Sequence, residues 1–350
     1  MHPLTTLLGI DCPIIQAPMA GTATPALAAA VSNAGALGSI SIAATDAEGG
    51  RAMLGQLHGA TAAPFNVNVF CHVPARPDAA IEAAWLDHLA PFFRAFEVEP
   101  PAALHDIYTS FSDGDGQLRV LLERPPKVVS FHLGLPPAGH IDALKRAGVT
   151  LLASATNLDE ALQVQAAGID IVVAQGDEAG GHRGIFDTGA ADPHLSTAAL
   201  LRLLAGRLAI PVVAAGGIMD GHDIAAAVAA GALAAQLGTA FVLCPESSAN
   251  AAYRAMLASA RARHTALTTV ISGRPARGIV NRFLREVGAP GHPPVPAFGI
   301  AYDGGKQLIA AAAGAGNHEF AAHWAGGGAA RARAMPAAQL VALLRTECGL

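Results

Sequence analysis

Short apolar runs alternate with longer amphipathic or Ala-rich segments along most of this chain. Eight runs read as strands buried on both faces, the pattern of a parallel sheet covered by helices. They span residues 13–17, 37–41, 65–70, 128–132, 150–154, 171–175, 211–215 and 233–237. Helices are expected at residues 25–34, 140–147, 158–167, 197–206 and 223–230. Eight such strands over about 240 residues predict a TIM (β/α)8 barrel, although periodicity alone leaves a doubly wound sheet open.

Two regions depart from the regular strand–helix units. Residues 71–126 are too long for one crossover and are expected to form an insertion with helices at 78–96 and 118–123. After the barrel segment, residues 1–243, the chain continues into a smaller and mainly helical domain, residues 244–330. This domain is expected to contain a helix at 250–264 and an irregular Gly/Pro-rich stretch at 287–305, and to pack over the barrel mouth. Residues 331–350 are expected to return to the barrel through a helix at 335–344.

Composition narrows the class of protein. Charged residues make up 14% of the chain and the formal net charge is −5, without a basic cluster, which argues against nucleic-acid binding. The four cysteines are scattered, without a C-x-x-C pair, which favours a reducing, cytoplasmic setting. The first residues lack the basic stretch of a secretory signal. Residues 224–244 are uncharged and long enough for a membrane span, but Gly231 and a change in composition favour a buried helix followed by a strand.

The loop after the sixth strand carries the clearest chemical signal. Four glycines and His182 lie within the nine residues after Gln175. Glycine lets the backbone approach a ligand closely, and histidine is the side chain best suited to proton chemistry near neutral pH. The segment therefore predicts a catalytic loop, or alternatively a Gly-rich connection with a surface histidine. Glu178 and His182 are four residues apart, but Gly180 and Gly181 make a helix unfavourable and no third ligand is evident, so no metal site is predicted.

Glycines also follow the last two strands, at Gly216–Gly217 and at Gly238, which precedes Thr239. In a barrel, backbone N–H groups at these positions and a helix N-terminus form a phosphate cradle. Two tight strand–helix turns are the alternative interpretation. Amide side chains lie at other strand ends, namely Asn68, Gln175 and Gln236, and amides suit the polar edge of a heterocycle. A phosphate site combined with inward-facing amides suggests FMN.

Five motifs in order resemble those of nitronate monooxygenases, formerly called 2-nitropropane dioxygenases. They are Gln16-Ala-Pro-Met-Ala-Gly21, Phe65-Asn-Val-Asn-Val69, the Gln175–His182 loop, Ala215-Gly-Gly-Ile218 and Gln236-Leu-Gly-Thr239. The resemblance covers nearly the whole chain. Residues 272–278 and 302–306 extend it toward the bacterial class I branch. It implies an FMN-dependent TIM barrel with a helical substrate domain.

The resemblance also implies roles for individual residues. His182 would be catalytic, and His132, Tyr302 and Lys306 would lie near the substrate. FMN would be contacted by Pro18, Met19, Asn68, Gln175, Gly180, Gly181, Gly216, Gly217, Gln236, Leu237, Gly238 and Thr239. The glycines at 326–328 depart from the Gly-Gln pattern of the family, which leaves their contribution to the flavin site open.

The implied reaction is the oxidation of an alkyl nitronate by O2 to a carbonyl compound and nitrite, after electron transfer to the flavin. His182 would hold the nitronate oxygens, or accept a carbon-bound proton from a neutral nitroalkane. Tyr302 and Lys306 would hold a second anionic end, as in propionate 3-nitronate. An FMN-dependent NAD(P)H reductase of quinones or enoyl thioesters and a non-catalytic flavin- or phosphate-binding protein are the alternatives. We expect small-molecule partners only, without membrane or nucleic acid, and a monomer or homodimer.

Overall fold

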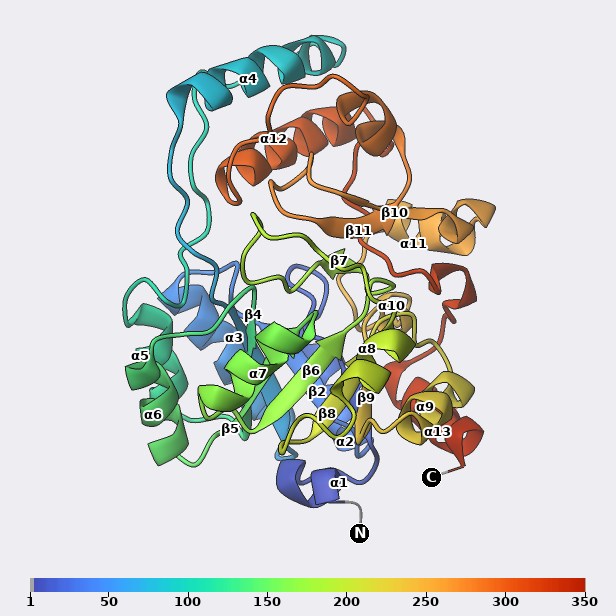
Figure 1. Ribbon diagram of the computed structural model, residues 1–350. Helices are drawn as coiled ribbons and strands as arrows, with labels where there is room; N and C mark the ends of the chain where they lie inside the picture. Colours follow the sequence, from blue (N-terminus) through green and yellow to red (C-terminus); the bar gives the residue numbers. More distant parts are fainter. Residues whose placement is uncertain (1–2, 350) are drawn as a thin grey trace.

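The computed structural model describes residues 3–349, and its lower half is a barrel of eight parallel strands (Figure 1). The strands are β1 (Ile14–Gln16), β2 (Gly38–Ser41), β3 (Phe65–Phe70), β4 (Val128–His132), β5 (Thr150–Ala155), β6 (Ile171–Gln175), β8 (Val212–Ala215) and β9 (Ala234–Leu237). They pair in the order β1-β9-β8-β6-β5-β4-β3-β2. A parallel bridge between Ile15 and Leu37 joins the two ends of this order. The ring is therefore closed, which confirms the predicted barrel and excludes the doubly wound sheet.

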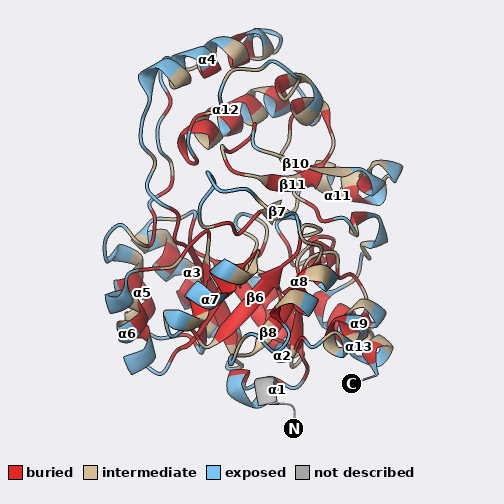
Figure 2. Cartoon of the chain, viewed as in Figure 1, coloured by how far each residue is buried: buried red, intermediate tan, exposed pale blue. Residues whose placement is uncertain are grey.

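Helices cover the outside of the barrel (Figure 2). They are α2 (Pro25–Asn33), α3 (Ala47–Ala60), α5 (Gly116–Glu123), α6 (Ala138–Arg146), α7 (Leu158–Ala166), α8 (Thr197–Leu204), α9 (Gly221–Ala229) and α13 (Ala337–Cys348), the last packing against α9 and α2. Helix α3 was not predicted, because its four glycines lower helix propensity. Burial of Leu54 and Leu57 in the core outweighs that cost.

The inside of the barrel is filled by side chains rather than left as a pore. Ile15, Leu152 and Val173 are among its buried residues. Leu8 of α1 (Pro3–Leu8) and Ile10 join this cluster and close the amino-terminal end of the barrel. Residues 224–244 belong to α9, β9 and the short helix α10 (Thr239–Val242), as the change in composition indicated. None of the helices within residues 3–349 is long and apolar enough to cross a membrane.

A second layer lies over the carboxyl ends of the strands (Figure 1). It contains α4 (Ala79–Arg94), α11 (Ala251–Ala258), α12 (Ile300–Gly314) and a small antiparallel sheet of β7 (Gly181–His182), β10 (Thr265–Thr268) and β11 (Ala276–Ile279). Short helical turns lie at η1 (Ala260–Arg263), η2 (Phe283–Val287) and η3 (Ala329–Arg331). Trp85 and Leu89 of α4 share a buried cluster with Leu308 of α12, so the insertion and the carboxyl-terminal region form one core.

Two elements of this layer differ from the sequence-based prediction. The small sheet was not predicted, because its strands are two to four residues long. The prediction of an irregular stretch over residues 287–305 was wrong for its last six residues, because α12 begins at Ile300. Gly304 and Gly305 lower the helix propensity of this segment, so the start of the helix was not predicted. A Cβ at Gly305 would lie 2.3 Å from the Ile271 carbonyl oxygen. These glycines therefore serve close packing inside a helix.

Candidate functional site

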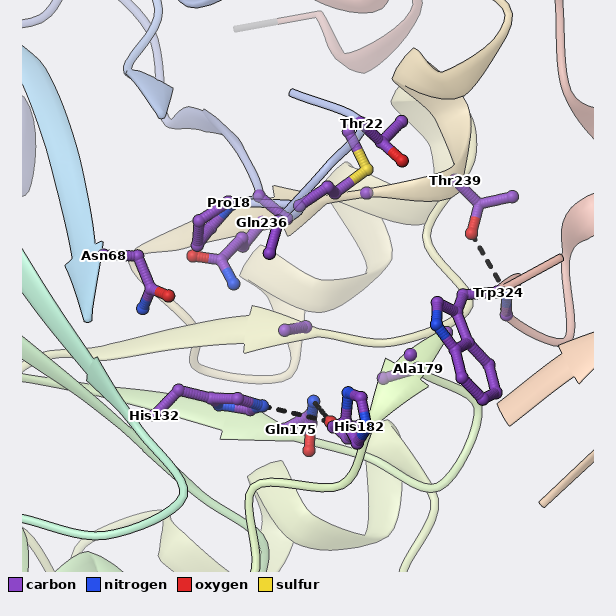
Figure 3. A pocket seen from close by; sticks show the side chains of 18 of the residues that line it. Pro18, Thr22, Asn68, His132, Gln175, Ala179, His182, Gln236, Thr239 and Trp324 are labelled. Atoms are coloured by element: carbon purple, nitrogen blue, oxygen red, sulfur yellow. Dashed lines mark hydrogen bonds between the residues drawn. The ribbon is translucent and has the colours of Figure 1, made fainter. Parts of the chain in front are cut away.

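One cavity of about 360 Å³ opens at the carboxyl ends of the barrel strands, beneath the upper layer. Its volume lies within the roughly 300–1,000 Å³ that is typical of ligand and cofactor pockets. Pro18 and Gln236 lie on one side of the cavity, and His132, Gln175 and His182 lie on the other (Figure 3). Fifteen of the sixteen residues singled out from the sequence line it. These are Pro18, Met19, Asn68, His132, Gln175, Gly180, Gly181, His182, Gly216, Gly217, Gln236, Gly238, Thr239, Tyr302 and Lys306.

Leu237 does not line the cavity. Successive side chains of a strand point to opposite faces, and here Gln236 takes the inward position. Leu237 is 1% exposed and packs in the outer core between barrel and helices. Its side chain therefore supports the barrel wall rather than a ligand.

One end of the cavity is built from backbone. Gly216 and Gly217 adopt positive φ angles of 124° and 72°, which favour glycine. The amide N–H groups of Gly217, Gly238 and Thr239 make no hydrogen bond to any other residue between 3 and 349. The Thr239 hydroxyl oxygen accepts a hydrogen bond of 3.0 Å from the Gly326 amide, which leaves the hydroxyl proton free to donate (Figure 3). We call these five residues the glycine cradle.

Crowding leaves no room for a side chain at two positions of the glycine cradle. A Cβ at Gly216 would lie 2.7 Å from the Thr197 hydroxyl oxygen and 3.0 Å from the Ala179 amide nitrogen. A Cβ at Gly326 would lie 2.6 Å from the Glu178 carbonyl oxygen. The glycines at 326–328, whose contribution the sequence left open, thus reach the cavity through Gly326. Since α10 is only four residues long, the cradle depends on local N–H groups rather than on a long helix dipole.

The three amide side chains at the strand ends differ in what they bond. Asn68 donates to Ser130 and accepts from the Ser41 hydroxyl at 3.1 Å. Gln175 donates to the His182 carbonyl oxygen at 3.0 Å and accepts from the Gly184 amide at 2.7 Å. Both amides therefore hold neighbouring segments of the protein. The side-chain amide of Gln236 has no hydrogen-bond partner within residues 3–349 and is free to bond a ligand in the cavity.

The loop that carries His182 is fixed to both layers. His182 and Gly181 form β7, which pairs with Ala276 and Arg277 of β11. The His182 carbonyl oxygen accepts hydrogen bonds from both Gln175 and His132, the latter at 3.1 Å. Ion pairs hold the flanking residues: Arg183 bonds Asp192 at 2.8 Å, and Arg277 bonds Asp177 at 2.6 Å. The histidine thus projects from a rigid support.

Glu178, the carboxylate considered beside His182, is held elsewhere. It accepts hydrogen bonds from the backbone and hydroxyl of Thr197, at 2.8 and 3.0 Å. Its carboxylate therefore orients the loop against the start of α8. The other acidic side chain of this segment, Asp177, pairs with the side chains of Arg277 and His194.

Both cavity histidines are neutral because of burial. Burial, followed by the charges of His132, Arg274 and His72, lowers the pKa of His182 to about 3. Burial is also the main cause that lowers the pKa of His132 to about 4. Both ring nitrogens of His132 are engaged, with the Ser154 hydroxyl at 2.9 Å and the His182 carbonyl. His132 therefore positions His182, whose Nδ1 has no partner among the described residues.

A cation and several aromatic rings line the cavity near the two histidines. The Lys306 ammonium lies 4.8 Å from the ring centroid of Tyr108 and 5.1 Å from that of Tyr302, as in cation–π contacts. Lys306 forms no ion pair with any acidic side chain in the described part of the chain, and it is exposed. Phe298 and Trp324 pack against the His182 ring. The cavity lining thus includes one unneutralised positive charge, Lys306, together with the aromatic rings of Tyr108, Tyr302 and Trp324.

Sequence reasoning missed several lining residues. The chain has only three tyrosines, and all of them line the cavity: Tyr108, Tyr253 and Tyr302. The rarity of tyrosine could have marked these residues as candidates for the site, although only Tyr302 lay in a recognised motif. Trp324 and Gly326 come from the upper layer. No local pattern marked them, because their place depends on how that layer packs over the barrel.

Comparisons with known proteins identify the family of this chain. A family model described as nitronate monooxygenase matches residues 1–347. A nitronate monooxygenase of Pseudomonas aeruginosa is 57% identical, covering 98% of each chain. The solved structure of nitroalkane oxidase from Streptomyces ansochromogenes has a TM-score of 0.88 and 41% identity, covering 99% of this chain and 97% of that one. FabK from Thermotoga maritima is more distant, with a TM-score of 0.75 and 28% identity over 100% of this chain and 96% of that one.

Proposed function

This chain belongs to the nitronate monooxygenase family of flavin-dependent oxidoreductases, and we propose that it binds FMN and oxidises small alkyl nitronates with O2. The products are a carbonyl compound and nitrite. The observation that supports the proposal is the lining of the cavity, which combines backbone N–H groups that have no partner among the described residues with a neutral histidine and an unneutralised lysine.

The glycine cradle fits the phosphate of FMN. The N–H groups of Gly217, Gly238 and Thr239 are unpaired donors among the described residues, and the Thr239 hydroxyl adds another. Gly216 lets this turn pack closely against Thr197 and Ala179, because a Cβ there would meet their atoms. Gln236 supplies a free amide for the polar edge of the ring system. Bound flavin would supply the one-electron acceptor that the nitronate needs.

The opposite end suits a small anion that carries an apolar group. Lys306 gives the positive charge that attracts a nitronate or a carboxylate on it, and Tyr302 offers a hydroxyl beside it. Burial raises the pKa of Tyr302 to about 12, so this hydroxyl stays a donor. His182 is neutral and presents Nδ1 to the cavity, where it accepts a proton from carbon when a neutral nitroalkane enters. Propionate 3-nitronate combines both anionic groups. The free, buried cysteines fit a reducing, cytoplasmic setting.

Anaerobic mixing of the FMN-loaded protein tests the proposal. Propionate 3-nitronate is expected to bleach the flavin absorbance rapidly, whereas NADH and NADPH are expected to leave it unchanged on the same time scale. Admission of air should then restore the absorbance and release nitrite. Rapid bleaching by NADH or NADPH would instead support a quinone or enoyl-thioester reductase. Retained FMN with no bleaching by any of these compounds would support a binding protein.

A further inference from the structure

A buried serine behind His182 fixes which nitrogen of the ring carries the proton. Ser272 is 1% exposed and lies outside the cavity lining. Its hydroxyl oxygen is 2.9 Å from His182 Nε2 and 3.2 Å from the Arg274 carbonyl oxygen. Ser272 precedes β11, the strand that pairs with β7, so the fold holds both partners of this contact in register.

The three groups have one arrangement that satisfies all of them. The Arg274 carbonyl accepts only, and it has no other hydrogen-bond donor within residues 3–349. A buried carbonyl without a donor is costly, so the single Ser272 hydroxyl proton goes to Arg274. Nε2 of His182 must then donate to the Ser272 oxygen, which requires the proton to be on Nε2.

The other ring nitrogen is open to the cavity. Nδ1 of His182 is bonded to no described residue, and it is absent from the polar atoms that are both buried and unpaired. Because burial keeps the ring neutral, with a pKa of about 3, a proton on Nε2 leaves a lone pair on Nδ1. A lone pair accepts a proton or a hydrogen bond, and it repels the oxygen of an anion.

We propose that Ser272 is a positioning residue that holds His182 as the Nε2-protonated tautomer, so that an unprotonated Nδ1 faces the reacting end of the cavity. Its catalytic consequence rests on the proposed function. Ser272 makes His182 an acceptor, and it leaves the attraction of the anionic substrate to Lys306. Without Ser272, Nε2–H loses its acceptor and the two tautomers become closer in free energy.

Nitrogen NMR of the FMN-loaded, ¹⁵N-histidine-labelled protein tests this directly. The His182 signals are assigned by their loss in His182→Asn. In the unmodified protein we expect one tautomer, protonated on Nε2. An Nδ1-protonated or mixed tautomer overturns the proposal, whether or not any Ser272 variant folds.

Variants sharpen the result. Ser272→Ala should lose the single-tautomer signal, and Ser272→Thr, which keeps a hydroxyl, should retain it. An unchanged His182 signal in Ser272→Ala overturns the proposal. Ser154→Ala is the matched control, since Ser154 bonds His132 Nδ1 at 2.9 Å and should alter the His132 signals alone. Nitronate turnover measured on the same unmodified sample separates the two proposals, because its absence would refute the function and leave the tautomer result standing.

Discussion

The two ends of the cavity present different kinds of groups, backbone N–H groups at one and side chains at the other. The glycine cradle uses backbone N–H groups and one hydroxyl, and none of its five residues has a side chain that titrates near neutral pH. The histidine end, which we define as His132, His182, Tyr302 and Lys306, uses side chains. Burial keeps its two histidines neutral, and only Lys306 brings a full charge.

Under the proposed function, this difference gives anchoring of the cofactor to the glycine cradle and selection of the substrate to the histidine end. Backbone donors bind an anion without regard to pH, and local chain geometry places them. Side-chain groups from several segments can discriminate between substrates, but each depends on how those segments pack. The comparison predicts that changes in the cradle alter cofactor affinity, whereas changes at the histidine end alter rate and substrate preference.

The largest expected effect is that of His182→Asn. Removing a positioned acid–base group typically costs about 10²–10⁴-fold in rate, so nitronate turnover should fall by at least about 100-fold. FMN should stay bound, because the cradle is untouched. Turnover and flavin content of the purified variant measure the two effects. The matched control is His222→Asn, since His222 is exposed on α9. Loss of FMN from His182→Asn would show that the two ends are not separable.

Gly216→Ala is expected to act on the other end. Its Cβ meets Thr197 at 2.7 Å and the φ of +124° is unfavourable for alanine, so FMN affinity should fall at least about 10-fold. Turnover at saturating FMN should change much less. Gly231→Ala is the control, because its φ is also positive at +104° but no atom lies within 4 Å of the added Cβ. Equal FMN affinities of the two variants, from fluorescence titration, would remove the cradle from the proposed site.

The same contrast explains how far the sequence could be interpreted. Barrel strands such as β3 and β6 are buried along their whole length, so their apolar runs mark them almost to the residue. The cradle glycines at 216, 217 and 238 follow two of these strands directly, so the strand pattern was enough to locate them. Local patterns were sufficient where local geometry determines position.

The histidine end shows where such patterns fail. Tyr108 comes from the insertion and Trp324 from the carboxyl-terminal region, and only the packing of the upper layer brings Trp324 against His182 and Tyr108 against Tyr302. Asn68 and Gln175 were expected to contact FMN, and both line the cavity, but the sequence did not indicate that their amides also hold protein segments. A residue type at a position does not reveal which of two available partners satisfies a buried polar group.

Lys306→Met tests whether the charge at the histidine end selects substrates that carry a carboxylate. Loss of the charge should raise KM for propionate 3-nitronate by about 5-fold, in line with the roughly 1 kcal/mol of an exposed ionic contact. KM for ethyl nitronate, which lacks the carboxylate, should rise less. Lys127→Met removes the same charge at the start of β4, at the opposite end of the barrel, and should change neither value. Equal increases for both substrates would place the contact of Lys306 at the nitronate group itself.

The smallest expected effect is the acid sensitivity of the histidine end. Burial lowers the pKa of His132 from 6.5 to about 4, so between these values the unfolded chain binds a proton that the folded chain does not. The free energy of unfolding should therefore fall as pH decreases from 7.5 to 5.5, with His132 contributing about 1 kcal/mol of that fall. Denaturant unfolding at both pH values should show a loss smaller by this amount in His132→Gln. His222→Gln, at an exposed position, should lose as much as the unmodified protein. An unchanged loss in His132→Gln would mean that this ring already takes up a proton in the folded protein, and that the histidine end is more polar than its burial indicates.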